Sequence, residues 1–416
     1  MNLNDIYEQR NRLYLQMNNV TRGGIVTGIC IGVVCFILGM VFKEETRTWG
    51  SFLFNLMLFF SLSLGGIAFG NMQDVIGATW GRPIKRLHES FGSFLIWATG
   101  FFFIFFICIK FGILGADRVY SWIHDPHIVS HFPGKNVWLT PDRMLIRDVL
   151  SLLCILGLST WHFKLTLGPD LALVQGNKAE AHRLGLTSKE KLRYWSAPVM
   201  ILYALCFSCI CFDLTMSLAP TWFSTLWGGW SFAIMMHILT ASTLIFMFAL
   251  KDTPIGAFFQ RQQFHDVGKL MHGFTVFFAY LTYAHVLTYW YTNIPEETSY
   301  FITRLKAPWI YFLLVSPVLS FIIPFFALIP KISKWSGNLT LPICAVVLLS
   351  QWITYLVIVM PEVADAAAWR FPWLEMGLFC GFLSLFLAVV FRFGSKVPMI
   401  SIADPLLLAA LHDCHK

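Results

Sequence analysis

The sequence predicts an all-α, polytopic integral membrane protein with about ten transmembrane helices. Hydrophobic residues make up 57% of the chain and charged residues only 13%, whereas a soluble domain carries about 25% charged residues. Ten apolar runs follow one another along the chain, and each is near the length of about 20 residues that a helix needs to cross a bilayer. The 40 Phe and 16 Trp residues are typical of lipid-facing surfaces and interfacial belts.

The elements divide the chain into three parts. Residues 1–23 form a polar, amphipathic lead that we expect to lie on the membrane surface. A membrane domain follows over residues 24–393, and we expect residues 394–416 to form a cytoplasmic C-terminal tail. The predicted spans are, in order, 24–42, 51–71, 91–114, 146–168, 196–218, 229–250, 270–292, 308–329, 341–360 and 373–393. We expect spans two to five and spans six to nine to form two four-helix bundles, with the first and last spans at the periphery.

The basic residues predict the orientation of these spans. If both termini lie on one side, that side collects 20 of the 30 Lys and Arg residues. The positive-inside rule then places both termini in the cytoplasm. The basic residues lie in short loops between apolar spans, so the net charge of +7 does not indicate nucleic-acid binding.

The longest outer loop, residues 115–145, is rich in possible metal ligands. It contains three His and three Asp residues: His124, His127, His131, Asp117, Asp125 and Asp142. A zinc site is one interpretation, and a solvated connector that touches a partner protein is the other. We assign no metal site to this loop.

The seventh span and its flanks hold most of the residues that could carry chemistry. Titratable and hydroxyl groups are costly in hydrocarbon and normally face a bundle interior or a cavity. The charged group at the inner mouth of this span comprises Asp266, Lys269 and His272. The candidates deeper in the span are Tyr280, Tyr283, His285 and Tyr289.

Other spans contribute two further candidates. Asp213 lies in the outer third of the fifth span, and a lone carboxylate at that depth is a functional-site hypothesis. His237 lies near the middle of the sixth span. The weaker candidates are His162, Gln351, Tyr355 and Glu375, of which Glu375 lies close enough to the interface to reach it by snorkelling.

These residues allow two interpretations. They could form a proton path from Asp266 and Lys269, past His272 and Tyr280, toward His285 and Asp213, or they could hydrogen-bond a quinone carbonyl. His272 and His285 are about 20 Å apart along a helix, so a path needs hydroxyl groups or waters between them. The alternative is a set of interhelical hydrogen bonds that ties the bundle together.

Motifs for several other chemistries are absent from the sequence. It contains no Walker A loop, no dinucleotide-binding glycine fingerprint, no CxxCH and no HExxH. No arrangement of a hydrolytic nucleophile stands out. We therefore predict no catalytic residue and no bound metal, and any redox centre would belong to other subunits.

Five stretches resemble the ActF family, the membrane subunits of bacterial alternative complex III. They are Phe52-Leu53-Phe54-Asn55 with Gly65-Gly66, Phe212 to Leu218, Trp222 to Thr225, His265 to Leu270 and Trp290 to Thr298. The resemblance covers residues 24 to 393, and its last two motifs are the most specific. This family is similar to ActC and to the membrane anchors of the polysulfide-reductase type, which hold two four-helix bundles within ten spans.

The resemblance implies a location and a set of partners. It implies the bacterial inner membrane and a quinol:electron-acceptor oxidoreductase complex, in which this chain is a subunit without a redox centre. The implied partners are an ActC-like quinol-oxidising subunit, a pentahaem cytochrome subunit, an iron–sulfur subunit, small membrane-anchor subunits, a terminal oxidase and lipids. Haem c and iron–sulfur clusters would lie on those partners, and quinol oxidation is assigned chiefly to the ActC-like subunit. A quinone, either menaquinone or ubiquinone, is the one cofactor that this chain itself could contact.

Two alternatives remain open at this point. Ten spans with buried His and Asp would also suit a secondary transporter. A transporter built from inverted repeats should have spans broken by Gly or Pro at matching positions, and Pro198, Pro317 and Pro324 form no such pair. A structural scaffold subunit without a proton role is the third interpretation.

Overall fold

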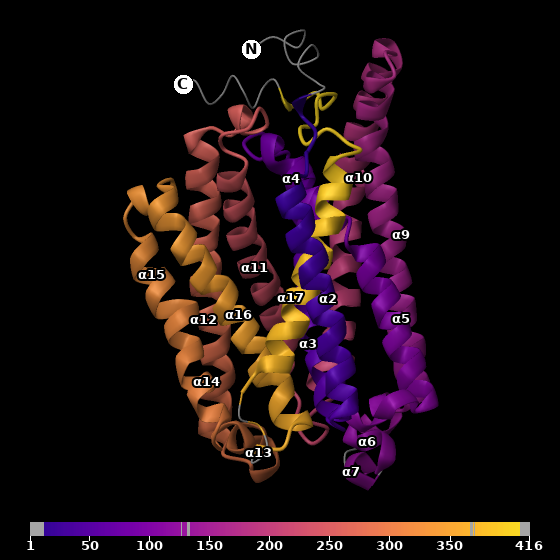
Figure 1. Cartoon of the computed structure of the whole chain (residues 1–416), viewed down its shortest axis with the longest axis vertical. Coiled ribbons are helices and arrows are strands. Elements are labelled where there is room, and N and C mark those ends of the chain that lie inside the picture. Colours follow the sequence, from indigo (N-terminus) through magenta and orange to yellow (C-terminus); the bar gives the residue numbers. More distant parts are fainter. Residues whose placement is uncertain (1–11, 126, 131–133, 367–368, 370, 408–416) are drawn as a thin grey trace.

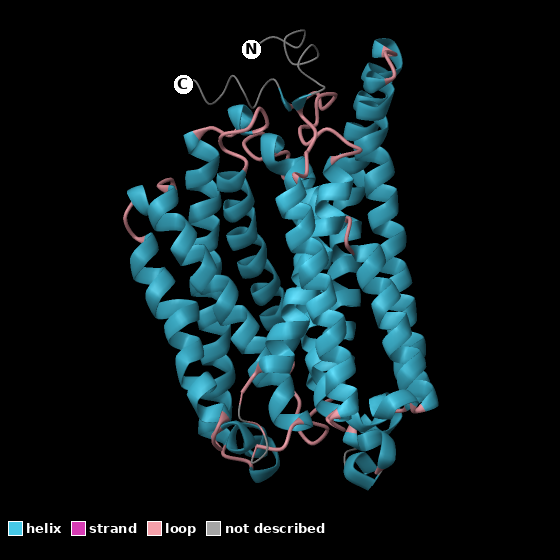
Figure 2. Cartoon of the chain, viewed as in Figure 1, coloured by secondary structure: helices cyan, strands magenta, loops and turns pink. Residues whose placement is uncertain are grey.

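The computed structural model describes residues 12–125, 127–130, 134–366, 369 and 371–407. Within this part of the chain the regular structure is entirely helical. In these residues, ten helices or helix pairs are long and apolar enough to cross a membrane. They stand side by side and roughly parallel (Figures 1 and 2). The predicted fold class is therefore confirmed, and each predicted span coincides with one of these helices.

The first five spans consist of long helices with short elements between them. Their bounds are α2 (Asn19–Val41), α3 (Glu45–Val75), α4 (Arg82–Gly92), α5 (Leu95–Phe111), α9 (Pro141–Val174) and α10 (Lys178–Cys211). A π-helical turn, η3 (Phe212–Met216), continues α10. The long loop between α5 and α9 holds η2 (Ile113–Val119), α6 (Ser121–His124), α7 (His127–Ser130) and α8 (Lys135–Trp138).

The second five spans include one interrupted helix. Their bounds are α11 (Trp227–Ala249), α12 (Arg261–Thr292), α14 (Trp309–Pro317), α15 (Ile323–Leu328), α16 (Gly337–Val363) and α17 (Trp373–Gly394). A π-helical segment, η5 (Val318–Ile322), joins α14 to α15. Pro317 and Pro324 flank it, and because proline has no N–H and crowds the preceding turn, it disturbs the regular hydrogen-bond ladder of an α-helix. The connecting segments hold η4 (Gly256–Phe258), α13 (Pro295–Arg304) and η6 (Ile332–Lys334).

The spans pack as two four-helix bundles, which meet where α3 packs against α11 and α16. In the first bundle α3 packs against α4, α5 and α10, and α9 packs against α5 and α10. In the second bundle α11 packs against α12 and α16, α16 packs against α14, and α12 packs against α15. Helices α2 and α17 pack on each other and on α3, outside both bundles.

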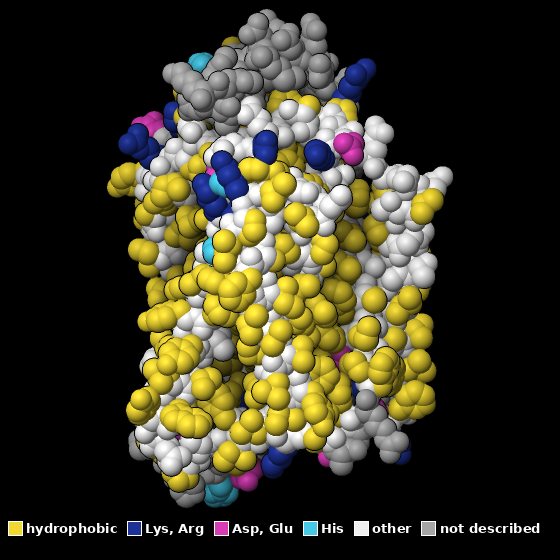
Figure 3. Space-filling view, turned by 90° about the vertical axis from the view of Figure 1, so that its left-hand side faces the viewer, with side chains coloured by type: hydrophobic (Ala, Val, Ile, Leu, Met, Phe, Trp, Pro, Cys, Tyr) yellow, Lys and Arg dark blue, Asp and Glu magenta, His cyan; other side chains and the backbone are white. Residues whose placement is uncertain are grey.

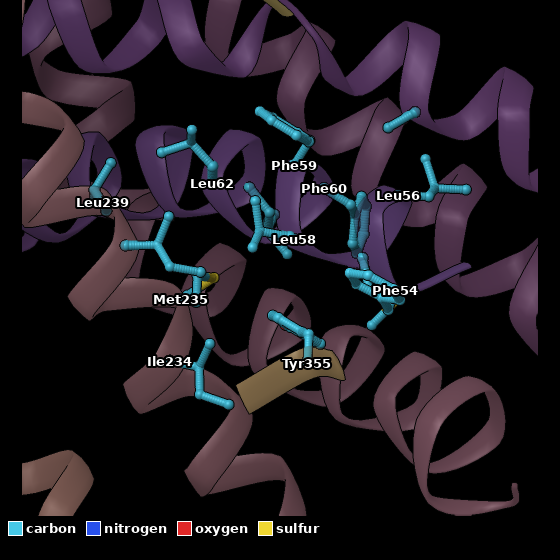
Figure 4. Packing of buried hydrophobic residues seen from close by; sticks show 14 of the residues in the cluster. Phe54, Leu56, Leu58, Phe59, Phe60, Leu62, Ile234, Met235, Leu239 and Tyr355 are labelled. Atoms are coloured by element: carbon cyan, nitrogen blue, oxygen red, sulfur yellow. The ribbon is translucent and has the colours of Figure 1, made fainter. Parts of the chain in front are cut away.

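Helix α3 lies at the centre of the molecule. Its apolar window is buried all round, which is typical of a helix that is hydrophobic on every face. Leu58 and Leu62 of α3 pack toward Met235 and Leu239 of α11 (Figure 4), and Phe54 packs edge-on against Trp352 of α16 with ring centres 5.8 Å apart. At Gly66 a Cβ atom would lie 2.3 Å from the carbonyl oxygen of His88, so only glycine allows α3 and α4 to approach this closely.

Charged side chains gather at the two ends of the bundle, and apolar side chains cover its flanks (Figure 3). The N-terminal end of α2 and the C-terminal end of α17 lie at the same end of the molecule (Figure 1), which we call the terminal end; the opposite end we call the distal end. At the terminal end, the backbone N–H of Leu15 donates to Gly394 and that of Met399 donates to Leu13. The described part of the N-terminal lead is thus fastened to the C-terminal segment.

Candidate functional site

One face of α9 carries a row of buried polar side chains. Asp148, Ser151, Ser159 and His162 are each less than 9% exposed, and their spacing of 3, 8 and 3 residues places them along one side of a helix. From Asp148 to His162 the row extends over about 21 Å at 1.5 Å per residue. Since this face packs against α10, the row lies inside the first bundle.

At the terminal end, the row meets a buried network of ion pairs. Arg86 donates to Glu89 (2.5 Å) and to Asp170, and His162 Nε2 lies 3.5 Å from Glu89 Oε1. Lys85 and Arg82 both pair with Asp74, at 2.9 and 2.7 Å, and Arg82 also reaches Asp404 at 3.3 Å. The network comprises three cations, Arg82, Lys85 and Arg86, and four carboxyl groups, Asp74, Glu89, Asp170 and Asp404.

The network is one positive charge short of balance when all four carboxyl groups are ionised. One bound proton would balance it, and buried charges are stable only when they are compensated. Both ring nitrogens of His162 and the neighbouring Glu89 Oε1 are buried without a hydrogen-bond partner, so the unsatisfied atoms of the network gather beside His162. Gln73 and the Nε of Arg86 are unsatisfied as well, which indicates sites for buried water.

A polar pocket connects this network to the terminal end. Its volume is about 360 Å³, and Asp74, Arg82, Lys85, Asp170 and Asp404 line it together with residues of α10. A pocket of this size and polarity holds several water molecules. We call it the vestibule.

The middle of the row consists of neutral groups. The Ser159 hydroxyl and the Tyr203 hydroxyl of α10 lie 3.1 Å apart. Beyond them, Cys206 lies within interacting distance of both Cys154 and Ser151, and Cys154 also neighbours Tyr203. Hydroxyl and thiol groups therefore bridge part of the distance of about 12 Å between Ser151 and Ser159.

At the distal end, the row finishes at a pair of carboxyl groups. Asp148 and Asp213 are both fully buried, and they interact electrostatically with each other and with Arg147. Neither carboxyl oxygen of Asp148 has a hydrogen-bond partner. Two carboxyl groups share one guanidinium, so this pair too is balanced when it holds one proton.

Asp213 is held in place from the long loop and from α9. It lies in the π-helical turn η3, a geometry that is frequent at functional sites. The indole N–H of Trp138 donates to Oδ1 at 2.8 Å, and Nε of Arg147 donates to Oδ2 at 2.6 Å. The Arg147 guanidinium lies 3.8 Å from the centre of the Trp138 ring. Tyr120 is the next titratable neighbour, and burial raises the pKa of its hydroxyl.

His237 belongs to a separate cluster in the second bundle, where both of its ring nitrogens have partners but Oε1 of Gln351 has none. The Gln351 amide donates to Nδ1 at 2.9 Å, and Nε2 lies 3.1 Å from the Thr275 hydroxyl. That hydroxyl donates to the Met271 carbonyl, so His237 must donate from Nε2. The imidazole is therefore neutral in this arrangement, and it ties α11 to α12 and α16.

The candidates on α12 do not form a continuous line. Asp266 pairs with Lys269 at 3.5 Å, and His272 stacks on Phe325 with ring centres 5.2 Å apart. Tyr280 and Tyr283, however, are 63% and 62% exposed on the outside of the bundle. The hydroxyls of α12 that face inward are those of Thr275, beside His237, and of Thr282, which accepts from the indole N–H of Trp230 at 2.9 Å.

His285 and Tyr289 bind the segment that follows η3 rather than Asp213. Ser224 Oγ lies 2.8 Å from Nε2 of His285, whose Nδ1 donates to the Leu281 carbonyl at 3.1 Å. The Tyr289 hydroxyl donates to the Phe223 carbonyl at 2.7 Å. Both side chains therefore have their hydrogen bonds within the chain.

The remaining candidates have structural partners. The Tyr355 hydroxyl lies 2.9 Å from the Ser61 hydroxyl. Glu375 does not snorkel to the interface: it is fully buried and pairs with Nε and Nη2 of Arg47 at 2.8 and 2.9 Å. A bidentate guanidinium satisfies this carboxylate inside the protein, so water is not needed.

The long loop offers no cluster of metal ligands within the described residues. His124 pairs with Asp117 at 2.9 Å, and His131 lies outside the described residues. Across the part of the chain that the structure describes, no group of three His, Cys, Asp or Glu side chains gathers closely enough to hold a metal ion.

A second feature is a deep groove in the second bundle, on its lipid-facing side. Its volume is about 650 Å³, and α11, α12, α13, α14, η5 and α16 contribute to its walls. Trp222, Trp227, Trp230 and His285 lie on its inner side, and Tyr280 and Tyr283 lie at its rim. Three of the predicted candidates thus meet at this groove.

The sequence analysis missed several residues that belong to the row or contact it. They are Asp148, Arg147, Glu89, Asp170 and Tyr203. The helical spacing of Asp148, Ser151, Ser159 and His162 is the signal that could have found the row. Asp170 lies on α9 eight residues after His162, whereas Glu89 and Tyr203 come from α4 and α10, and their meeting with the row depends on the tertiary fold.

No known family model matches the chain, and no curated protein is significantly similar to it in sequence. We therefore infer the function from the buried polar row of the first bundle and from the five sequence stretches that resemble the ActF family.

Proposed function

We propose that this chain is a membrane subunit of a quinol-oxidising respiratory complex in the bacterial inner membrane, and that it conducts protons through its first bundle. The row from the vestibule to Asp148 and Asp213 is the observation that carries the proton role. Among the ion-paired groups at each end of the row, carboxyl groups outnumber cations by one, so each end is neutral when it holds one proton and carries one negative charge after releasing it.

The proposed orientation determines which side of the membrane each end of the route faces. With both termini in the cytoplasm, the vestibule faces the cytoplasm and the Asp148–Asp213 pair faces the periplasm. Protons would enter at Asp74 and Asp170, reach His162 and Glu89, and pass the hydroxyl of Tyr203 on the way to Asp148. Water between Ser159 and Ser151 would complete the relay.

The partners follow from the resemblance alone. An ActC-like subunit would oxidise quinol, and an iron–sulfur subunit and a pentahaem cytochrome subunit would carry the electrons onward. Small membrane-anchor subunits, a terminal oxidase and lipids complete the proposed surroundings. This chain would supply a proton route beside that chemistry and no redox centre of its own.

The test uses the assembled complex, recognised by haem c and iron–sulfur absorbance that co-purify with the chain, in proteoliposomes. Asp148→Asn and Glu89→Gln keep the shape of each side chain but remove its exchangeable charge. We expect each to lower the number of protons moved per electron at least tenfold when quinol is supplied. Proton movement is followed with a pH-sensitive dye, and electron transfer is measured separately.

The matched control is Asp266→Asn, an isosteric change at the partly exposed start of α12. We expect it to leave proton movement unchanged. Equal losses in Asp266→Asn and Asp148→Asn would place the route along α12 instead. Normal proton movement in all three variants would contradict the proton role and favour a structural scaffold subunit. A purified chain without haem or iron–sulfur absorbance would contradict membership of the complex.

A further inference from the structure

The segment that follows α17 forms one wall of the vestibule. Residues 395–407, which we call the strap, lie at the terminal end of the molecule (yellow in Figure 1). Several of them line the vestibule, namely Ser401, Ala403, Asp404, Pro405 and Leu406. The strap therefore helps to close the pocket through which water reaches the buried ion-pair network.

The two halves of the strap are held in different ways. In the first half, Met399, Ile400 and Ile402 are at most 3% exposed, and the backbone N–H of Met399 donates to the Leu13 carbonyl at 2.9 Å. In the second half, residues 403–407, Leu407 is the one apolar side chain that is buried. Apolar burial thus fixes the first half, whereas the second half depends largely on polar contacts.

Charge-assisted hydrogen bonds join the second half of the strap to the network. The backbone N–H of Ala403 donates to Oδ1 of Asp170 at 2.8 Å. Nη1 of Arg82 donates to Oδ2 of Asp404 at 3.3 Å, and the backbone N–H of Leu406 donates to Oδ1 of the same carboxylate at 2.9 Å. Because these bonds involve charged groups, the charge of the network affects how firmly the second half is held.

Docking of the second half changes the charge balance of the network. In the docked state, Asp404 is one of four carboxyl groups that face three cations. When residues 403–407 leave, Asp404 passes into water, and the three cations face only the carboxyl groups of Asp74, Glu89 and Asp170. Because buried charges are stable only when they are compensated, the docked network favours one bound proton and the released network favours none.

The charged and titratable groups that face Asp404 come from every helix that lines the vestibule. They are Asp74 of α3; Arg82, Lys85, Arg86 and Glu89 of α4; His162 and Asp170 of α9; and Lys189 and Arg193 of α10. The two cations of α10 are exposed, so water and salt screen them. The other groups are buried, and the charge balance among them decides whether a proton is bound.

We propose that the strap is a proton-linked gate: docking of its second half brings one proton into the network, and release of that half returns the proton. The docked state binds more protons than the released state, so docking strengthens as the pH falls, by up to about tenfold per pH unit. The gating role rests on the proposed proton route, whose entrance a released strap leaves unloaded. The link between docking and proton uptake is independent of that route.

The first test follows hydrogen exchange of the backbone amides by mass spectrometry, with the purified full-length chain in detergent between pH 8 and pH 6. After correction for the pH dependence of exchange in an unstructured peptide, we expect the protection of Ala403 and Leu406 to rise by up to about tenfold for each pH unit as the pH falls. Met399 is the internal reference in the anchored half, and its protection should stay constant. Protection of Ala403 that does not change with pH would overturn the proposal.

Asp404→Asn tests the charge argument, because the neutral amide keeps the shape of the side chain but removes the fourth carboxyl group. The docked network is then neutral without a proton, so the protection of Ala403 should no longer depend on pH. Asp252→Asn is the matched control, since Asp252 is exposed between α11 and α12 and does not line the vestibule, and it should behave as the wild type does. Unchanged pH dependence in Asp404→Asn would contradict the coupling.

Gly185→Ala displaces the strap without changing any charge. A Cβ atom at Gly185 of α10 would lie 2.9 Å from the backbone oxygen of Ala403, so the second half must move away. We expect the protection of Ala403 and Leu406 to fall at every pH while that of Met399 stays constant. Gly168→Ala on α9 is the matched control, because no atom lies within 4 Å of its Cβ position. Equal protection of Ala403 in the two variants would show that the strap is not seated against α10.

The same glycine variants in the assembled complex separate the gate from the route. We expect Gly185→Ala, but not Gly168→Ala, to lower the number of protons moved per electron. A loss in Asp148→Asn without a loss in Gly185→Ala would overturn the gate and leave the route intact. Normal proton movement in Asp148→Asn, together with pH-linked protection of Ala403, would contradict the route and leave the proton-linked docking intact.

Discussion

At the scale of single residues, the number of satisfied hydrogen-bonding atoms separates structural side chains from candidates for chemistry. His237 and His285 each have partners at both ring nitrogens, so they hold helices together. His162 and Asp148 are equally buried but have unsatisfied atoms, which is costly unless a proton or water reaches them. The same residue types thus differ in role because of their surroundings.

Lys135 gives a prediction about pH at this scale. Its Nζ donates to the carbonyls of Pro220 (2.6 Å) and Trp222 (2.9 Å), and burial lowers the pKa of its amine to about 8. An ordinary lysine has a pKa of about 10.4. At pH 8 about half of Lys135 is therefore neutral and nucleophilic, whereas an exposed lysine is almost entirely protonated.

We expect Lys135 to be acetylated by a limiting amount of an amine-reactive ester at pH 8 before the exposed lysines are. Lowering the pH to 6.5 protonates most of the amine, so the rate at which Lys135 is modified should fall about 16-fold, while its preference over exposed lysines persists. Peptide mass spectrometry measures the modified fraction, and exposed Lys269 serves as the internal reference. Equal modification of both lysines at pH 8 would contradict the lowered pKa.

At the scale of elements, the sequence is sufficient to locate the transmembrane spans. It is not sufficient to predict which face of each helix points into the protein and which points to lipid. The bilayer imposes a length of about 20 apolar residues, so every span could be located from its apolar run. In α9 and α12 alike, however, apolar residues occur on every side, because lipid and protein interior are equally apolar. The inward face of α12 holds Thr275 rather than Tyr280, and no hydrophobic periodicity distinguishes the two.

The contact between α3 and α4 gives a prediction at the scale of elements. A Cβ atom on Gly66 would lie 2.3 Å from the backbone oxygen of His88, and backbone cannot move aside as a flexible side chain can. We expect Gly66→Ala to destabilise the protein by about 1–3 kcal/mol and to lower its melting temperature in detergent by about 2 °C or more.

Gly229→Ala is the matched control, because no atom lies within 4 Å of the Cβ position on this glycine of α11. Alanine favours the helix over glycine by about 0.5–1 kcal/mol, so this variant should melt at the same temperature or higher. Equal melting of both variants would show that α3 and α4 are not held as closely as the structure indicates.

At the scale of the whole molecule, the two bundles have different character. The first encloses charged groups that meet across α3, α4, α9 and α10, and the second carries a groove that faces the membrane. The division into bundles could be predicted from the order of the spans. The partners of Asp213 could not, because Trp138 and Arg147 lie 75 and 66 residues away in the chain, and only the packed structure brings them together.

The orientation of the whole molecule gives the last prediction. Gln175 is exposed at the turn between α9 and α10, at the terminal end, and Asn136 is exposed in α8, at the distal end. Because 20 of 30 basic residues belong to the terminal side, the positive-inside rule places Gln175 in the cytoplasm. In a background with Cys414→Ser, a membrane-impermeant maleimide should label Asn136→Cys from outside intact cells and Gln175→Cys only in inverted vesicles. The reverse pattern would invert the proposed orientation of the proton route, and labelling of both from one side would contradict the fold, since α9, which lies between the two positions, is long and apolar enough to cross the membrane.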